Sequence, residues 1–390
     1  METLKKIVTE KGTPLLFFSS KEFKESYQNL QKFLPTVKHH YALKPLPLKE
    51  CVKIIDDCEG YIDIASVGEI EFIKNTRPEL LSKAIYTHPI KKLSDISIAI
   101  ENGVNVMVVD NIIELKKLIP FASEVKILFR LSFSNSEALC DLSEKFGINE
   151  STFKELLTVA LNNKMNVLGC CFHVGSQMKH PQKHVDAIVK CRELYDWAFV
   201  NLKIKFPVLN IGGGFPTMYS ENDIDLESYC MPIDSIIKEL FFDTEIWSEP
   251  GRTVAANSML AFLQVVGKAE KNGTIWYYLD DGAFNTFSGI FFEHMNYNLF
   301  QLNPRDTKDL KSIFTGPTCD GYDILLRDVM FPELEVGDVL FAKRIGAYSW
   351  ATRTNFNLLG ETPIEHYDFN LLEIENFTKN QIKEKYAESI

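Results

Sequence analysis

The 390-residue sequence has no long hydrophobic run and no excess of positive charge. Its longest apolar stretch, Met259 to Val266, is too short to cross a bilayer. The opening residues, Met1 to Lys6, are polar, and no apolar signal segment follows them, so we expect a cytoplasmic protein. The formal net charge of -11 argues against nucleic acid as a partner, because binding to phosphates needs a basic surface. An acidic surface weakly favours the approach of cationic small molecules.

The 8 cysteines are scattered, and none shows the paired spacing of a metal site, so we expect reduced thiols and no bound metal. The chain also lacks internal repeats and low-complexity segments. Its apolar share, 45%, is ordinary for a globular protein with a substantial core, and its length favours two domains.

Between about residues 21 and 258, short β-rich runs alternate with amphipathic, helix-like runs. The β-rich runs are His40–Lys44, Tyr61–Ser66, Ala84–His88, Val106–Asp110, Lys126–Leu131, Val167–Val174, Val208–Gly213 and Glu245–Glu249. The helix-like runs include Glu50–Asp57, Lys92–Glu101, Ile112–Ile119, Ser151–Asn162, Val185–Phe199 and Leu226–Leu240. Strands that alternate with helices indicate right-handed crossovers and a parallel sheet. Eight such units predict an α/β fold, a (β/α)8 TIM barrel.

Residues suited to binding or catalysis lie at the carboxyl end of almost every β-rich run. They are Lys44, Asp63, Ser66, His88, Asp110, Arg130, His173, Ser176, Gly212 to Gly214, Glu249 and Arg252. In a barrel these positions meet at the carboxyl ends of the strands, where active sites are built. The alternative is that chains simply become polar on entering loops, which accounts for Asp110 and His88 but not for the whole set.

After Ser258 the pattern changes to strand-like runs separated by turns. These runs are Ala261–Val266, Thr274–Leu279, Ile313–Gly316 and Val339–Ala342. We therefore expect a mostly-β domain over residues 259–372, completed by an N-terminal strand within residues 1–20. Residues 373–390 form a polar tail, either helical or frayed.

Two segments have the chemistry of a phosphate site. Gly212-Gly213-Gly214 follows a buried strand and leaves backbone N–H groups open to a phosphate, although a glycine triplet alone is more often a tight turn. Glu249-Pro250-Gly251-Arg252 ends the next strand, and its arginine can reach the same phosphate while its carboxylate faces a protonated ring nitrogen.

Two single residues can each be interpreted either as functional or as an ordinary structural or surface residue. Lys44 ends an apolar strand, where desolvation would favour the neutral amine that a Schiff base needs, but most lysines are ordinary surface residues. His173 suits stacking on a planar ring, acid–base work or metal binding, and metal is the weakest of these because no partner ligand accompanies it. A lone strand histidine is more often structural.

These motifs, in this order and spacing, resemble the barrel-fold decarboxylases of ornithine, lysine, arginine and diaminopimelate, which depend on pyridoxal 5'-phosphate (PLP). The resemblance runs from about Pro14 to Pro363 and is strongest to the eukaryotic-type ornithine and bacterial lysine/ornithine enzymes. It implies an alanine-racemase-like barrel with a β domain. It also implies decarboxylation of a basic L-amino acid to a diamine and carbon dioxide, a step of polyamine biosynthesis.

The resemblance also implies residue roles. Lys44 would carry the cofactor, and Glu249 would pair with its ring nitrogen while His173 stacks on the ring. The remaining cofactor contacts would be Asp63, Glu69, Arg130, Ser176, Gly212, Gly213, Gly214, Gly251, Arg252 and Tyr348. Cys319, supplied by the partner subunit of a homodimer, would return a proton to the substrate, and Asp320 would bind its distal amine. Phe356 and Phe284 would line the substrate site.

Four positions depart from the family pattern: Pro45-Leu46-Pro47 after the lysine, Asn210 where aspartate is common, Phe284 for a tyrosine, and Glu293 for the aspartate that binds the distal amine. The extra methylene of Glu293 is worth roughly 1–3 kcal/mol in substrate discrimination. It is compatible with a shorter diamino acid, with arginine through a two-pronged contact, or with tolerance of ornithine or lysine.

Three other functions fit the sequence less well. A catalytically dead regulatory homologue is disfavoured because Lys44, His173, Glu249 and Cys319 are all present. An alanine racemase would not use the Cys319-Asp320 pair. Diaminopimelate decarboxylases read Cys-Glu-Ser-Gly where this chain has Cys319-Asp320-Gly321.

Overall fold

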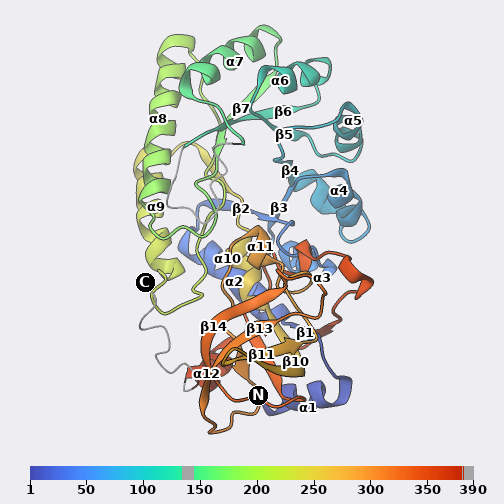
Figure 1. Ribbon diagram of the computed structural model, residues 1–390. Coiled ribbons are helices and arrows are strands. Elements are labelled where there is room, and N and C mark those ends of the chain that lie inside the picture. The colour runs from blue at the N-terminus through green and yellow to red at the C-terminus, as the bar shows by residue number, and fades with distance from the viewer. Residues whose placement is uncertain (134–144, 380, 382–390) are drawn as a thin grey trace. The chain divides into compact units, whose positions relative to one another are not determined.

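The computed structural model describes residues 1–133, 145–379 and 381, and the chain divides into two compact units. Lys24–Val254 form one unit, here called the barrel unit; Met1–Phe23 and Ala255–Ile390 form the other, here called the β unit. In Figure 1 the barrel unit runs from blue through green to yellow, and the β unit is largely orange and red. Within the described ranges, no helix is both long enough and apolar enough to cross a membrane.

The barrel unit contains a closed sheet of parallel strands in chain order from β2 to β9. The strands are β2 (Val37–Ala42), β3 (Tyr61–Ile64), β4 (Ala84–Tyr86), β5 (Val106–Val109), β6 (Lys126–Leu131), β7 (Asn166–Phe172), β8 (Val208–Asn210) and β9 (Glu245–Ser248). Closure comes from β9 pairing with β2, where Val37 lies opposite Ile246. The predicted barrel is confirmed, and each strand lies within or beside the β-rich run that predicted it.

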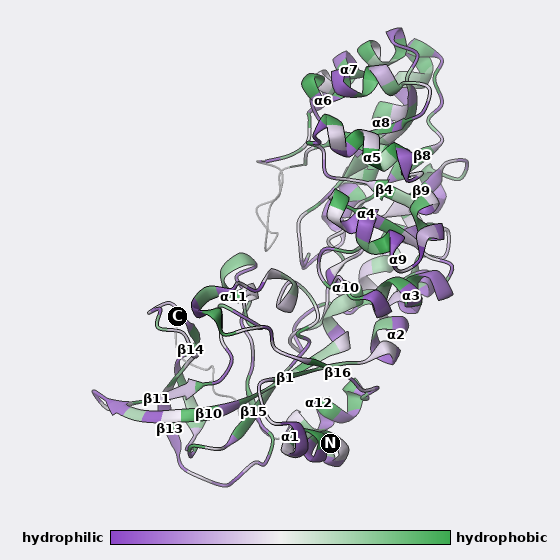
Figure 2. Cartoon of the chain, turned by 90° about the vertical axis from the view of Figure 1, so that its right-hand side faces the viewer, coloured by the Kyte–Doolittle hydropathy of each residue, from purple (hydrophilic) through white to green (hydrophobic). Residues whose placement is uncertain are grey.

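The helices of the barrel unit connect successive strands. They are α3 (Lys49–Asp57), α4 (Val67–Lys74), α5 (Leu93–Glu101), α6 (Ile112–Leu118), α7 (Glu150–Asn162), α8 (Gln182–Leu202), α9 (Leu226–Leu240) and α10 (Arg252–Ala255), the last of which runs one residue past the unit. Side chains of Asn111, Asn149 and Asp225 accept hydrogen bonds from the first free N–H groups of α6, α7 and α9 and so fix where these helices begin. Green and purple alternate along these helices in Figure 2, which is typical of helices with one buried face.

Apolar side chains fill the interior of the barrel. They come from most of the strands and include Ile85, Val108, Leu128, Leu168, Val208 and Trp247. The barrel is therefore closed by a packed core, and active sites of such barrels lie at the strand ends.

The β unit is built around a sheet in the order β12-β15-β10-β11-β13-β14. β1 also pairs with β10, and β16 pairs with β1. The strands are β1 (Leu15–Phe18), β10 (Met259–Lys271), β11 (Thr274–Leu279), β12 (Phe300–Gln301), β13 (Asp309–Thr315), β14 (Ile324–Pro332), β15 (Val339–Lys343) and β16 (Ile364–His366). β1 is antiparallel to β10 and parallel to β16. The expected completion of the β domain by an N-terminal strand is thus confirmed.

Helices α1 (Glu2–Lys11) and α12 (Leu371–Lys379) pack on this sheet through a shared apolar core. Leu4 and Val8 of α1 and Ile374 of α12 are buried there with Phe262 and Phe341. The start of the polar tail is therefore helical. The unit also contains α2 (Ser20–Phe33), shared with the barrel unit, and the short α11 (Gly289–Phe292).

Candidate active site

The predicted site positions fall into two groups, one in each unit. The larger group lies in the barrel unit, at or just beyond the carboxyl ends of β2, β3, β6, β7, β8 and β9. The smaller group lies in the β unit and consists of Tyr348, Cys319, Asp320, Glu293, Phe284 and Phe356.

Lys44 and Asp63 form the centre of the barrel group. The Lys44 Nζ atom lies 3.9 Å from Asp63 Oδ2, and Thr87 donates a hydrogen bond to the other carboxylate oxygen. Asp63 is 3% exposed, and burial raises the pKa of its carboxyl while the charges of Lys44 and Arg130 lower it. The Lys44 side chain is 44% exposed, so the amine is less desolvated than its place after an apolar strand predicts.

Glu249 follows β9 and shares this acidic region. Burial raises its pKa to about 7, with the Asp63 charge acting in the same direction, and Lys44 and Arg130 oppose the rise. Burial likewise raises the pKa of Glu69 to about 7. Acidic groups whose ionisation is this unfavourable are suited to a cationic partner, because a nearby positive charge would restore their ionised form.

The glycine triplet is required by the approach of neighbouring backbone. A Cβ atom on Gly212 would collide with the carbonyl of Phe172, one on Gly214 with the carbonyl of Gly175, and one on Gly213 would lie 2.6 Å from the carbonyl oxygen of Glu249. Gly212 and Gly214 also have positive φ angles, 68° and 103°. The loop after β8 therefore lies directly against the chain that follows β7 and β9.

Arg252 lies beside this loop with two hydroxyl groups. Its Nε and Nη2 atoms each donate to Ser176 Oγ at 3.1 Å, and Nη1 donates to Tyr219 Oη at 3.3 Å. Arg252 is almost fully buried. A guanidinium, hydroxyls and glycine backbone N–H groups are the donors that a phosphate group requires.

His173 follows β7 and adjoins the glycine loop. Its Nδ1 atom accepts a hydrogen bond from the N–H of Gly175 at 3.0 Å, and its Nε2 atom would lie 3.0 Å from a Cβ atom on Gly213. Burial and the charges of Arg130 and Lys44 hold its pKa well below the usual value, so the ring is neutral. A neutral, fixed imidazole suits stacking on a planar group. No cluster of three possible metal ligands occurs among the described residues.

Glu69, Arg130 and Gly251 are placed less directly. Glu69 accepts a hydrogen bond from the N–H of Ala65 at 2.5 Å, just before α4, so its carboxylate also stabilises a helix end. The Arg130 guanidinium lies 5.1 Å from the centre of the Phe146 ring and contributes its charge to Asp63 and Glu249. Gly251 lies in the turn between β9 and α10.

Taken together, the barrel group fits PLP, because it contains phosphate donors, a carboxylate for a protonated ring nitrogen and a lysine amine. The fit rests on the donor set around Arg252 and on the raised carboxyl pKa values.

In the β unit, Cys319 and the aromatic residues form a second group. The N–H and the thiol of Cys319 both donate to Asn357 Oδ1, at 3.2 and 3.4 Å. The adjacent Phe356 ring lies 4.9 Å from that of Phe284, which lies 5.1 Å from Phe291 of α11. The chain places Cys319, Phe356 and Phe284 together.

The remaining β-unit positions adjoin this group. The N–H of Glu293 donates to the carbonyl of Gly289 at 3.0 Å and so ends α11. A Cβ atom on Gly289 would lie 3.0 Å from the carbonyl oxygen of Tyr348, so the Tyr348 turn packs on α11. Asp320 follows Cys319, and its carboxylate accepts from the N–H of Tyr322 at 2.8 Å.

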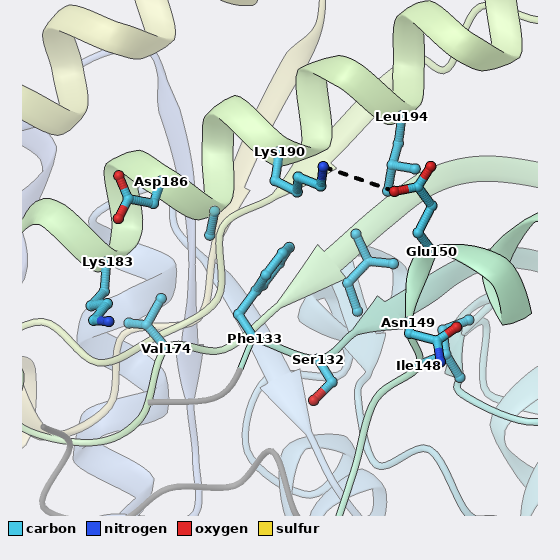
Figure 3. Close-up of a pocket in the computed structure, with 12 residues that line it drawn as sticks. Ser132, Phe133, Ile148, Asn149, Glu150, Val174, Lys183, Asp186, Lys190 and Leu194 are labelled. Atoms are coloured by element: carbon cyan, nitrogen blue, oxygen red, sulfur yellow. Dashed lines mark ion pairs between the residues drawn. The ribbon is translucent and has the colours of Figure 1, made fainter. Parts of the chain in front are cut away.

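The barrel unit also has a hollow of about 450 Å3 elsewhere, between the outer side of the barrel wall and α8. Figure 3 shows Phe133 pointing toward α8, and a dashed line marks the ion pair between Lys190 and Glu150, which also line the hollow. None of the predicted site residues lines this hollow, so it is separate from the strand-end site.

Sequence reasoning missed three neighbours of the site. Thr87 follows β4 directly, so the strand-end rule that selected His88 would also have found it. Tyr219 and Asn357 lie in loops, and only the folded chain brings them to Arg252 and Cys319.

Comparison with known proteins agrees with this geometry. Residues 20–256 match the family described as pyridoxal-dependent decarboxylase, pyridoxal binding domain. This chain belongs to that family. It is 33% identical to the lysine/ornithine decarboxylase of Selenomonas ruminantium over 346 residues, covering 88% of this chain and 87% of that protein.

Two solved structures are also similar. The lysine/ornithine decarboxylase of Vibrio vulnificus complexed with putrescine has a TM-score of 0.88 and 34% identity, covering 94% of this chain and 98% of the other. The arginine decarboxylase of Paramecium bursaria Chlorella virus bound to agmatine has a TM-score of 0.87 and 28% identity, covering 94% and 100%. The chain is thus similar to PLP-dependent decarboxylases over nearly its whole length.

Proposed function

We propose that this protein is a PLP-dependent decarboxylase of a basic L-amino acid of the ornithine or lysine class, producing a diamine and carbon dioxide for polyamine synthesis. The observation that carries the proposal is that Lys44, Asp63, Glu249 and the Arg252–Ser176 donors all lie at the strand ends of one barrel of this family. When bound, PLP supplies an electron sink for the bond that breaks at the substrate Cα.

The barrel residues have separate tasks in this proposal. Lys44 would hold the cofactor covalently through Nζ. Gly212 to Gly214, Ser176 and Arg252 hold the phosphate, and Glu249 holds a proton at the ring nitrogen. His173 would stack on the ring as a neutral partner, because its own protonation is suppressed. Asp63, Glu69 and Arg130 set the charge around the amine. Gly251 and Tyr348 complete the cofactor contacts.

The β-unit residues handle the substrate. The Cys319 thiol would donate the proton that takes the place of the departed carbon dioxide at Cα and so completes the amine product. Asp320 and Glu293 bind the distal cation of the substrate, while Phe284 and Phe356 cover its methylenes. The contact of the thiol with Asn357 Oδ1 supports the proposal, because it holds the Cys319 sulfur in one position.

We further propose that the active protein is a homodimer, in which each site uses Cys319 from the partner subunit. Apolar side chains flank Cys319 and Glu293 at the surface of the β unit: Phe292, Tyr322, Phe356, Leu358 and Leu359 are 53%, 78%, 41%, 88% and 51% exposed. An apolar patch of this kind favours coverage by another protein surface. We place this dimer in the cytoplasm, with domains over residues 21–258 and 259–372.

Glu293 supports a second candidate substrate. A carboxylate one methylene longer than aspartate can pair with a guanidinium through two hydrogen bonds, and an arginine decarboxylase is among the similar structures. The higher identity to lysine/ornithine enzymes favours the diamino acids. A shorter diamino acid is also compatible with Glu293, because the extra methylene of this side chain would compensate for the methylene that the substrate lacks.

The test is carbon dioxide release by purified holoenzyme from ornithine, lysine, arginine, diaminobutyrate and diaminopimelate. We expect one of the first four to dominate. Absence of release from all five, with cofactor bound, would contradict the proposal and favour a non-catalytic homologue.

Subunit sharing has its own test. Mixed dimers of a Lys44→Ala chain and a Cys319→Ala chain contain one site with both residues intact. Measured as formation of the amine product, an equal mixture should gain about a quarter of the wild-type rate over the two variants assayed separately, whereas sites contained within one subunit would give no gain.

A further inference from the structure

Asn210, at the end of β8, connects the two halves of the cofactor site. Its Nδ2 atom donates to Glu249 Oε1 at 2.7 Å, and its Oδ1 atom accepts from the N–H of Gly212 at 2.9 Å. Because the Gly212 N–H is only a donor, the amide orientation is fixed: oxygen faces the glycine loop and nitrogen faces the carboxylate. The side chain is fully buried.

The surrounding backbone holds this contact at a fixed length. The N–H of Ile211 donates to the carbonyl of Trp247 at 2.8 Å, and the N–H of Glu249 donates to the carbonyl of Gly212 at 2.8 Å. These bonds lie on either side of the side-chain contact, so residues 210 and 249 cannot separate without breaking the ladder between β8 and β9.

We propose that Asn210 is a positioning residue that holds the Glu249 carboxylate in place as an anion. A carboxylate at position 210 could still accept from Gly212, but its second oxygen would face Glu249 Oε1 across a hydrogen-bond distance. Two carboxylates this close must share a proton. The amide removes that requirement, because it supplies the hydrogen itself.

The charged surroundings of Glu249 do not remove the need for this donor. The titratable groups around it are Asp63 on β3, Lys44 after β2, Arg130 on β6, Cys171 on β7 and His173 after β7. Burial raises the pKa of Glu249 to about 7, and the hydrogen bond from Asn210 is one of the contributions that lower it. Asn210 therefore favours the charged form at neutral pH.

The proposal rests on the proposed role of Glu249 beside the cofactor, but its test is separate from activity. The first variant is Asn210→Asp, which keeps the acceptor for Gly212 and replaces the donor to Glu249 with a second carboxylate oxygen. The measurement is the unfolding temperature of the full-length chain, freed of cofactor, between pH 7 and 9. We expect the variant to lose about 5 °C more than wild type over this range, since its buried pair holds a proton that the unfolded chain releases.

Two further variants make the result specific. Asn210→Asp combined with Glu249→Gln exchanges the amide and the carboxylate, and it should restore the wild-type dependence on pH. Asn163→Asp is the matched control: Asn163 Nδ2 donates to a carbonyl, that of Val159, at 2.8 Å, so the same charge change meets no carboxylate. Its dependence on pH should follow wild type.

A dependence on pH in Asn210→Asp that equals wild type or the control would overturn the proposal. Cofactor affinity, measured by fluorescence titration, separates it from the proposed function. The exchanged double variant should bind PLP roughly 10–100-fold more weakly, because the glutamine introduced by Glu249→Gln carries no charge for the ring nitrogen. If it recovers stability but binds PLP like wild type, Asn210 acts as proposed and the assigned role of Glu249 is wrong.

Discussion

Replacing Glu249 with glutamine should make the cofactor-free barrel more stable while weakening its hold on PLP. The substitution preserves shape, and the amide oxygen of the new side chain can still accept from Asn210. Glu249 has its pKa raised from 4.5 to about 7, so the folded chain retains a proton that the unfolded chain has lost between these values. At about 1.4 kcal/mol per unit, and reduced for partial exposure, the ionised carboxylate costs about 2–3 kcal/mol above pH 7.

The raised pKa of Glu249 determines how the free energy of unfolding depends on pH. A carboxyl group with a raised pKa contributes its full stability below about pH 4.5 and loses it as the pH rises through 7. Wild type and Glu249→Gln should therefore have similar free energies of unfolding at pH 4.5, and the variant should be more stable at pH 8.

Urea unfolding of the cofactor-free chain, followed by tryptophan fluorescence, measures this difference; Trp197 and Trp247 report on the barrel unit, and Trp276 and Trp350 report on the β unit. Glu155→Gln, an exposed change on α7, is the control and should have no effect. Equal or lower stability of Glu249→Gln at pH 8 would refute the view that the buried, ionised carboxylate destabilises the folded chain. Its PLP affinity should fall roughly 10–100-fold.

The other predictions concern individual groups. Lys44→Ala should lose the PLP that borohydride traps on the wild-type chain, as mass spectrometry would show; trapping on the variant would assign the covalent bond to another lysine. Cys319→Ala should still release carbon dioxide but give some aldehyde beside the amine, and clean amine would exclude the thiol as the proton donor. Asn357→Asp should slow alkylation of Cys319 at pH 8, since a carboxylate opposes thiolate formation, and an unchanged rate would show that the contact is not made in solution. Glu293→Asp should reorder the preferred substrates by roughly 1–3 kcal/mol, and an unchanged ranking would locate selectivity elsewhere.

The sequence predicted the barrel because its strands are buried on both sides and bounded by polar residues. The β unit was harder. β14 was not predicted, because most of its residues are exposed or half-buried and its alternation is weak, although it pairs with β13 from Asp309 to Thr315. Such a strand is specified by its partner in the sheet rather than by its own pattern.

The candidate site shows the same division between local and long-range information. Strand ends identified Lys44, Asp63 and Glu249, because a parallel barrel gathers those positions whatever the loops do. The hydrogen bonds of Tyr219 to Arg252 and of Asn357 to Cys319 join residues 33 and 38 positions apart, through loops without a regular pattern. The roles assigned to the site residues stay predictions until the variants are measured.

Asn210 shows why a departure from a family pattern should be read through its contacts. Judged from residue identity alone, asparagine in place of aspartate removes a negative charge from an acidic region and suggests the loss of a functional group. In the folded chain the same change supplies the hydrogen that a second carboxylate would have to take from solvent, and it does so beside Glu249, whose own ionisation is already unfavourable. The substitution is therefore better explained as support for one charge than as the absence of another.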